Sequence, residues 1–175
     1  NYIWKGAAPF ERKPDKIDIL PIQGKLKEIG SLRSARHLTI QMKYGVNVRP
    51  LFLETSAPPQ SCLIMYHQDH NANYLGERGW YAKFLSAGCD VIAVPLPLTL
   101  GAAPILADIE GRKVSVKNHD ELAGLESSDF SPLAYFLELF IISLNLALSE
   151  NKYRKVAAVG LSGGGWVAVV SGALD

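Results

Sequence analysis

The sequence has little net charge, few cysteines and no long uninterrupted hydrophobic run. Its 175 residues include 18 Lys and Arg against 17 Asp and Glu, so the formal net charge is +1. Such a balance creates no large field that would attract nucleic acid, and we therefore exclude nucleic acid as a partner. Hydrophobic residues make up 48% and charged residues 20%, which is typical of an ordinary globular domain with a sizeable core.

No segment combines the length and the apolar character of a membrane span. The most hydrophobic stretch, residues 133–148, is interrupted by Glu138, Ser143 and Asn145, and it is shorter than the ~20 residues that cross a bilayer. The first residues lack the apolar core of a signal peptide, and the chain begins with Asn1 rather than Met. We expect that an upstream portion has been removed, which leaves a cytoplasmic and an exported location both open.

Only two cysteines are present, Cys62 and Cys89, each beside an apolar run. Two buried free thiols are the simpler prediction, because free cysteine is among the most buried residue types. A disulfide is the alternative if the two strands are neighbours, and only the Cα separation decides between them.

The N-terminal third predicts an arm followed by a hairpin. Residues 1–35 mix Pro, Lys and Gly and predict an irregular arm with one short strand at 17–22. Residues 36–54 then alternate between apolar and polar, which predicts two antiparallel strands joined at Tyr44-Gly45.

Strands and helices then alternate along the chain. Short continuous apolar runs, typical of strands buried on both faces, occur at residues 62–66, 91–94 and 156–159. Helical patterns occur at residues 76–87, 132–150 and 166–174. A long loop is expected at residues 99–129.

Two of these helices have residues that favour a helix end, and for both the buried side can be predicted. Gly88 is placed as the stop of the first helix, and Ser131 as the N-cap of the second with Pro132 at its first position. The buried side of the first helix is expected to comprise Trp80, Phe84 and Leu85. That of the second is expected to comprise Leu133, Phe136, Leu137, Phe140, Ile141, Leu144 and Leu148.

This order of elements predicts an α/β fold. Residues 36–175 are expected to form one domain, a mostly parallel sheet flanked by helices with the antiparallel hairpin at its front.

The segment that indicates chemistry is Gly160-Leu161-Ser162-Gly163-Gly164, a G-x-S-x-G sequence at the end of the last strand. The spacing fits a sharp strand-to-helix turn that strains the serine backbone and exposes its hydroxyl. Gly160 and Gly164 lack bulk where strand and helix approach each other. The N–H of Gly163, at the start of the helix, would face an oxyanion on an attacked carbonyl. The alternative is a glycine-rich turn with no chemistry.

Two stretches carry a family resemblance. The nucleophile segment of α/β-hydrolases resembles the stretch KVAAVGLSGGGWVAVV. That family's third strand, oxyanion loop, first helix and fourth strand are similar to CLIMYHQDH with RGWYAKFLSAGCDVIAVPLP. The resemblance covers residues 36–174, is nearest to the esterase and dienelactone-hydrolase-like branches, and implies Ser162 as nucleophile. It also implies a second oxyanion donor in residues 67–70, from the backbone N–H of Gln68 or Asp69. The family commonly has His-Gly here, whereas this chain has His67-Gln68, and we expect His67 to hold the loop by hydrogen bonds.

The acid and the base of a catalytic triad are not evident. In this family the chain order is Ser, then Asp or Glu, then His, but only 13 residues follow Ser162 and none is histidine. We therefore expect the acid and the base outside this chain, which would be inactive by itself because a serine hydroxyl needs a base.

Three other functions are the alternatives. His67-Gln68-Asp69-His70 matches the latter part of the H-x-H-x-D-H pattern of metal-dependent hydrolases, but Met65 stands where the first histidine belongs. A phosphate-binding loop at Gly160, Gly163 and Gly165 fits neither G-x-G-x-x-G nor the P-loop. A non-catalytic protein of the same fold is the third alternative.

The sequence therefore predicts a serine hydrolase of small-molecule carboxylic esters or related acyl bonds that needs no cofactor. Its oligomeric state and its substrate are left open.

Overall fold

Strands and helices alternate along the chain, as the computed structural model shows for residues 3–5, 8–68, 75–99, 104–150 and 152–173. The strands are β1 (Lys16–Leu20), β2 (Leu32–Gln41), β3 (Asn47–Val48), β4 (Leu51–Thr55), β5 (Cys62–His67), β6 (Cys89–Val94), β7 (Ile105–Ile109), β8 (Arg112–Val116) and β9 (Lys155–Gly160). The helices are α1 (Arg78–Ser86), α2 (Leu133–Ser149) and α3 (Gly163–Gly172), with short 3-10 helices η1 (Gly24–Glu28), η2 (Lys43–Gly45) and η3 (His119–Leu125).

The main sheet has the strand order β1-β2-β4-β6-β5-β9, and the short β3 pairs with β2. The pairs among β1, β2, β4 and β6 are antiparallel, whereas β6, β5 and β9 run parallel. The predicted α/β class, with an antiparallel front to a parallel sheet, is confirmed. Residues 16–20 and 32–35 are strand, so the irregular part of the N-terminal region is shorter than predicted.

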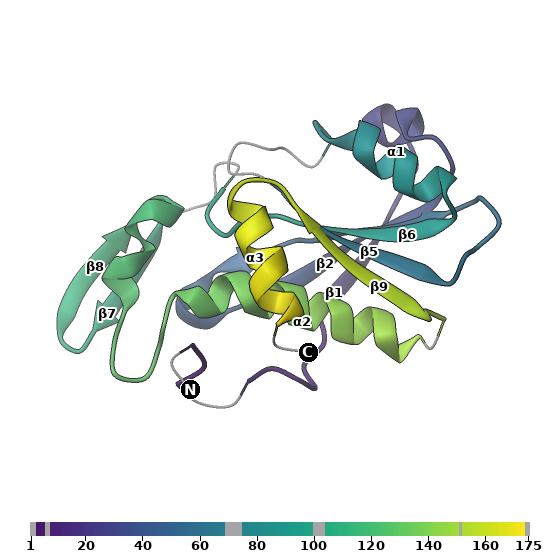
Figure 1. Ribbon diagram of the computed structural model, residues 1–175. Helices are drawn as coiled ribbons and strands as arrows, with labels where there is room; N and C mark the ends of the chain where they lie inside the picture. The colour runs from purple at the N-terminus through teal and green to yellow at the C-terminus, as the bar shows by residue number, and fades with distance from the viewer. Residues whose placement is uncertain (1–2, 6–7, 69–74, 100–103, 151, 174–175) are drawn as a thin grey trace.

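Helices cover both faces of this sheet (Figure 1). Successive side chains of a strand point to opposite faces, so Ile64 and Tyr66 of β5 join the core beneath α1, whereas Leu63 and Met65 join the core beneath α2. α3 lies on the α2 side, where its residue Val167 packs with α2. The helices that follow β5 and β9 therefore lie on opposite faces.

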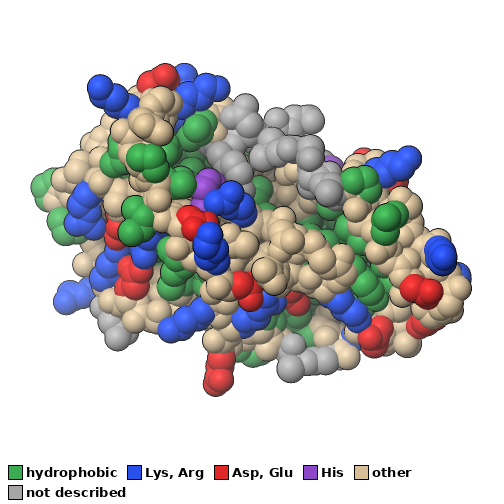
Figure 2. All heavy atoms as spheres, turned by 180° about the vertical axis from the view of Figure 1, so that it is seen from behind, with side chains coloured by type: hydrophobic (Ala, Val, Ile, Leu, Met, Phe, Trp, Pro, Cys, Tyr) green, Lys and Arg blue, Asp and Glu red, His purple; other side chains and the backbone are tan. Residues whose placement is uncertain are grey.

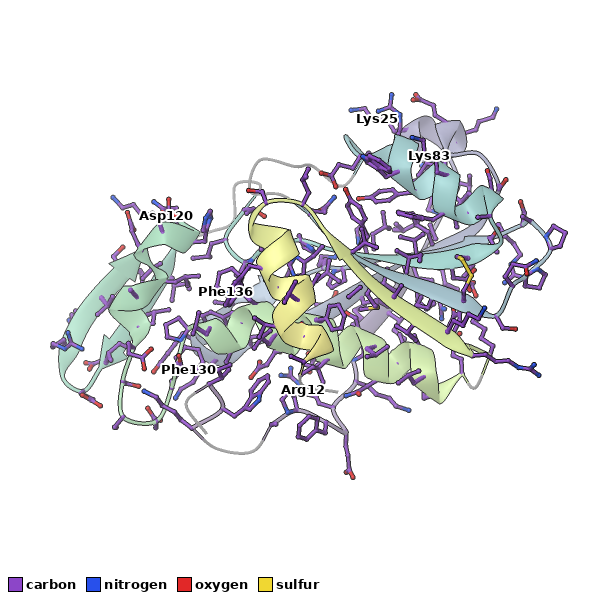
Figure 3. The ribbon with its side chains drawn as sticks, in the orientation of Figure 1. Arg12, Lys25, Lys83, Asp120, Phe130 and Phe136 are labelled. Carbon is purple, nitrogen blue, oxygen red and sulfur yellow. A yellow bond between two sulfur atoms is a disulfide. The ribbon has the colours of Figure 1, made fainter. Side chains whose placement is uncertain are left out.

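The buried side of α1 differs from the predicted one. Tyr81 and Leu85, four residues apart on one side of the helix, face the core and are fully buried. Trp80, predicted to be buried, is 51% exposed, and the Lys83 ammonium lies 4.4 Å from its ring centre (Figure 3). The predicted stop at Gly88 is confirmed by its positive φ of 82°.

α2 is buried around more of its circumference than one stripe, because it contacts the sheet, α3 and the N-terminal segment at Pro9 and Arg12. Of the predicted stripe, Leu137 and Phe140 are buried, and Leu148 is 44% exposed. The predicted cap is wrong: the Ser131 hydroxyl donates to Glu126 at 3.1 Å instead of capping the helix.

The predicted loop at 99–129 contains a lobe that extends to one side of the sheet (Figure 1), and its buried residues, such as Ile105 and Leu122, belong to the core beneath α2. β7 and β8 form an antiparallel hairpin around Glu110-Gly111, where φ is 52° and 80°, as in the two-residue turns that match strand twist. η3 follows, and its Asp120 lies on this lobe (Figure 3). The prediction of a structureless loop is therefore wrong for residues 105–125.

The two cysteines are bonded to each other. Cys62 of β5 lies opposite Cys89 of β6 in the parallel register, with a Cα separation of 4.8 Å (Figure 3). The prediction of free thiols is wrong, and the disulfide alternative is confirmed.

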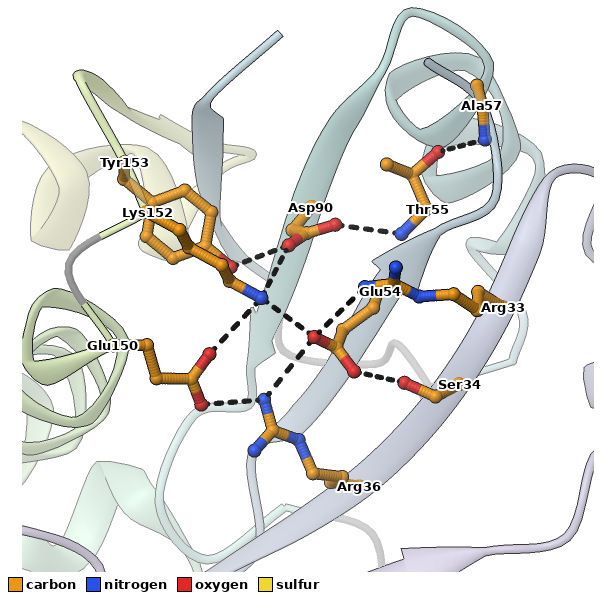
Figure 4. Close-up of polar contacts among 10 residues, drawn as sticks. All are labelled: Arg33, Ser34, Arg36, Glu54, Thr55, Ala57, Asp90, Glu150, Lys152 and Tyr153. Atoms are coloured by element: carbon orange, nitrogen blue, oxygen red, sulfur yellow. Dashed lines mark hydrogen bonds and ion pairs between the residues drawn. The ribbon is translucent and has the colours of Figure 1, made fainter. Parts of the chain in front are cut away.

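An ionic cluster joins the elements at the amino ends of the parallel strands (Figure 4). The Lys152 ammonium lies 2.7 Å from a carboxylate oxygen of Glu54, 3.2 Å from Asp90 and 3.1 Å from Glu150. Burial opposes ionisation of Glu54, but hydrogen bonds from Lys152 and Ser34 and the positive charges nearby lower its pKa to about 2. The cluster therefore lies at the other end of the parallel strands from the carboxyl ends of β5 and β9.

Charges of both signs are interspersed over the face seen in Figure 2. In the part of the chain that the structure describes, no helix has both the length and the hydrophobicity that crossing a bilayer requires.

Candidate active site

The predicted site residues meet where β5 and β9 end. The two strands are parallel neighbours, and His67 at the end of β5 lies opposite Gly160 at the end of β9. α1 and α3 leave these ends on opposite faces, and open α/β sheets bind ligands outside such strand ends.

Ser162 stands in the turn between β9 and α3. Its backbone angles are φ 54° and ψ −121°, a conformation that costs a non-glycine residue about 1–3 kcal/mol. The residue is exposed, and its hydroxyl makes no side-chain hydrogen bond within the described ranges. The strained turn and the accessible hydroxyl agree with what the G-x-S-x-G spacing implies.

Close backbone approaches require glycine on both sides of Ser162. A Cβ on Gly160 would lie 2.1 Å from the Gly164 carbonyl oxygen, and one on Gly164 would lie 2.4 Å from the His67 carbonyl oxygen. Neither position tolerates a side chain without a shift of the backbone. A Cβ on Gly165 would lie 3.4 Å from the Gly160 carbonyl oxygen, which is an ordinary contact. The backbone packing at Gly160 and Gly164 therefore requires glycine, whereas their part in a nucleophile turn stays a prediction.

In the first turn of α3, one backbone N–H has no acceptor among the described residues. The N–H groups of Gly164 and Gly165 donate to the carbonyls of Leu161 and Ser162 at 2.9 and 3.0 Å. The N–H of Gly163, the first residue of the helix, has no acceptor in the helix. It is therefore available to an anion beside Ser162.

Of the two residues predicted to supply the second oxyanion donor, one uses its backbone N–H elsewhere. The N–H of Gln68 donates to the Val94 carbonyl of β6 at 3.0 Å, so it is engaged in extending the sheet. Asp69, the other candidate, lies outside the described residues.

His67 is fully buried at the end of β5. Burial lowers its pKa to about 4, so the imidazole is neutral at pH 7. Neither ring nitrogen has a hydrogen-bond partner of ordinary geometry among the described residues, although the backbones of Gln68 and Phe136 lie close enough to act against the lowering of this pKa. The role in holding the loop by hydrogen bonds stays a prediction, because the loop after Gln68 lies outside the described residues. The main-chain carbonyl of His67 packs against Gly164.

The metal alternative gains no support from the described residues. Among them no group of three His, Cys, Asp and Glu side chains is placed to hold an ion. Asp69 and His70, which that alternative also needs, lie outside the described ranges.

Sequence reasoning missed one residue of this region. Tyr81 of α1 is fully buried, and its hydroxyl accepts a hydrogen bond from the Gln68 side-chain amide at 2.7 Å. A buried tyrosine needs a partner for its hydroxyl, but the helical pattern placed Trp80 rather than Tyr81 toward the core.

Solved esterases share this arrangement of elements. An acetyl xylan esterase from Paenibacillus sp. R4 matches with a TM-score of 0.65 and 17% identity, over 91% of this chain and 49% of that one. Acetyl xylan esterase 1 from Thermoanaerobacterium sp. JW/SL YS485 matches with a TM-score of 0.55 and 18% identity, over 93% and 49%. A cold-adapted esterase from an Arctic intertidal metagenomic library gives a TM-score of 0.50 and 14% identity, over 81% and 54%.

These similarities establish the fold. The chain has the α/β-hydrolase fold, as its resemblance predicted, and it spans about half the length of the solved structures it matches. No protein-family model and no curated protein matches its sequence.

Proposed function

We propose that this protein is a serine hydrolase of carboxylic esters or related acyl bonds, with Ser162 as its nucleophile. The observation that carries the proposal is the exposed serine held at φ 54° between a strand end and a helix start. Such strain persists only where the surrounding structure enforces it, and it concentrates at functional sites. The fold shared with solved esterases agrees with this function.

The chemistry follows from the groups around Ser162. The hydroxyl attacks the ester carbonyl as a base takes its proton, and an acyl-enzyme forms as the base returns this proton to the leaving alcohol. Water then attacks the acyl-enzyme, which releases the carboxylic acid and the serine hydroxyl. The N–H of Gly163 and the N–H of Asp69 would stabilise the oxyanion of the tetrahedral intermediate.

The base is proposed to be a histidine outside these 175 residues. No histidine follows Ser162 in the sequence, and the buried His67 is a poor base because its pKa is about 4. The substrate is expected to be a small ester, and no cofactor enters the reaction.

The test is labelling of the full-length protein with a fluorescent fluorophosphonate, together with hydrolysis of 4-nitrophenyl acetate. The wild type should be labelled and active, and Ser162→Ala should lose both properties. Ser61→Ala is a matched control, because Ser61 also has a positive φ, of 52°, but precedes β5 at the other edge of the sheet. A folded wild type that takes no label, or a labelled Ser162→Ala, would favour a non-catalytic protein of this fold.

A further inference from the structure

A half-exposed tryptophan lies one helical turn from Ser162. The N–H of Trp166 donates to the carbonyl oxygen of Ser162 at 3.4 Å across the first turn of α3. A long side chain on a helix leans toward the turn before its own Cα, and for Trp166 that turn begins at Ser162. Trp166 is 45% exposed, and Leu161, which directly precedes Ser162, is 53% exposed. Exposed apolar residues therefore occur on both sides of the proposed nucleophile along the chain.

The packing of α3 on the sheet does not depend on this tryptophan. The buried residues of α3 are Gly164, Val167, Ala168 and Ser171, whose three- and four-residue spacing is that of one side of a helix. Trp166 lies off that side, and nearly half of its surface is open to solvent. Ligand sites are lined mostly by apolar and aromatic side chains with a few polar groups. An exposed indole next to a candidate nucleophile fits that description.

Phe136 holds the ring of Trp166 from one side. Phe136 belongs to α2 and lies beside α3 (Figure 3), and the two rings meet edge-on, with centroids 6.1 Å apart and planes at 88°. Edge-to-face pairs of this kind are favourable. Phe136 itself packs against the buried cluster of Leu96, Leu137 and Val167. The indole is therefore oriented before a ligand binds, and its exposed part forms a preorganised apolar surface.

We infer that Trp166 is a specificity-determining residue of the candidate site, whose ring binds an alkyl or aromatic group of the ester. The inference rests on the proposed function, because attack by Ser162 is what brings the ester to this surface. Burying apolar area against the ring favours a larger apolar group, by up to roughly fourfold in kcat/KM for each methylene. The substrate class is therefore small esters that carry an apolar group larger than methyl.

The experiment compares tryptophan variants of the full-length protein on two series of esters. In one series the acyl group grows, from 4-nitrophenyl acetate to the butanoate and the hexanoate. In the other the alcohol grows, from ethyl acetate to butyl and hexyl acetate, and acid release is followed by titration. Trp166→Ala removes the ring, and Trp166→Phe keeps part of its apolar surface. Trp80→Ala is the matched control, because Trp80 is 51% exposed and lies on α1, on the opposite face of the sheet.

Wild-type kcat/KM should rise with chain length in at least one series, and that series identifies whether the acyl or the alcohol part contacts the ring. Trp166→Ala should flatten this rise, with kcat/KM roughly tenfold lower for the longest ester and within about twofold for the shortest. Trp166→Phe should lie between the two, and Trp80→Ala should match the wild type. The ratio between two esters does not depend on how much of the protein is folded, so a loss of stability alone leaves it unchanged.

The contrary results are distinguishable. If hydrolysis depends on Ser162 but Trp166→Ala keeps the wild-type ratio between long and short esters, the ring packs against protein rather than substrate. The inference is then overturned and the proposed function stands. A wild type without a rise in either series overturns it in the same way. If the wild type hydrolyses no more ester than Ser162→Ala, the proposed function fails and this inference fails with it.

Discussion

Loss of the Cys62–Cys89 disulfide should lower the free energy of unfolding by about 3.5 kcal/mol. The two cysteines are 27 residues apart in sequence, and closing a loop of that size removes about 12 cal/mol/K of entropy from the unfolded chain. Their strands are already paired in register through the β5–β6 ladder. The native backbone should therefore move little without the bond, and most of the effect should arise in the unfolded state.

The measurement is urea unfolding at 25 °C, followed by far-ultraviolet circular dichroism. Three samples are compared: the oxidised wild type, the wild type in excess dithiothreitol and the double variant Cys62→Ala, Cys89→Ala. The reduced wild type and the double variant should both unfold at lower urea than the oxidised wild type. The double variant should not respond to dithiothreitol, which separates loss of the bond from other effects of the reductant.

Two outcomes would refute this reasoning. Titration of two free thiols in the unfolded, unreduced protein would show that the bond is absent. A difference below about 1 kcal/mol between the oxidised and reduced protein would show that the bond does not restrict the unfolded chain as the loop-closure estimate requires.

Two further predictions concern the turn at Ser162 and the ionic cluster. Gly164→Ala should lower the free energy of unfolding by at least about 3 kcal/mol, because its Cβ would meet backbone atoms. Gly165→Ala, the control, should be nearly neutral in thermal or urea unfolding. Equal effects of the two substitutions would contradict the close approach. The pKa of Glu54 is about 2 in the folded protein, below its ordinary 4.5. Its ionised form therefore contributes stability that is present above pH 4.5 and is lost as the pH falls toward 2, by up to about 3 kcal/mol. Glu54→Gln should flatten the pH dependence of unfolding between pH 5 and 2, and an unchanged slope would refute the assignment.

Local sequence signals were sufficient for most of the main sheet. The apolar runs predicted β5 and β6 because strands buried on both faces exclude polar residues. The run at residues 156–159 also predicted a strand, but the expectation that it is buried is wrong, because β9 is an exposed strand at the end of the sheet. The turn at Ser162 was predictable for a similar reason, since Gly160 and Gly164 are needed wherever a strand and a helix approach so closely.

Features that depend on distant contacts were not predictable in the same way. The disulfide required knowledge that β5 and β6 are neighbours, and the Ser131 hydroxyl turned to Glu126 rather than to its own helix. The β7–β8 hairpin did leave a signal. Ile105 and Ile109 alternate with polar or exposed positions before a Glu-Gly turn, a pattern hidden by the glycines and prolines around it.

The arrangement of the site separates two parts of the proposed chemistry. The strained serine and its oxyanion donor depend on the register of β5 with β9 and on the start of α3, which the described residues contain. The base has separate requirements, because a group that acts as a base near neutral pH needs a pKa near 7 and contact with the hydroxyl. Burial keeps the pKa of His67 well below 7, His37 lies within β2, and His119 lies in the side lobe. His70 lies outside the described residues. The conformation of Ser162 should therefore persist whether or not a base is present, and the proposed base would approach the hydroxyl from the carboxyl ends of β5 and β9.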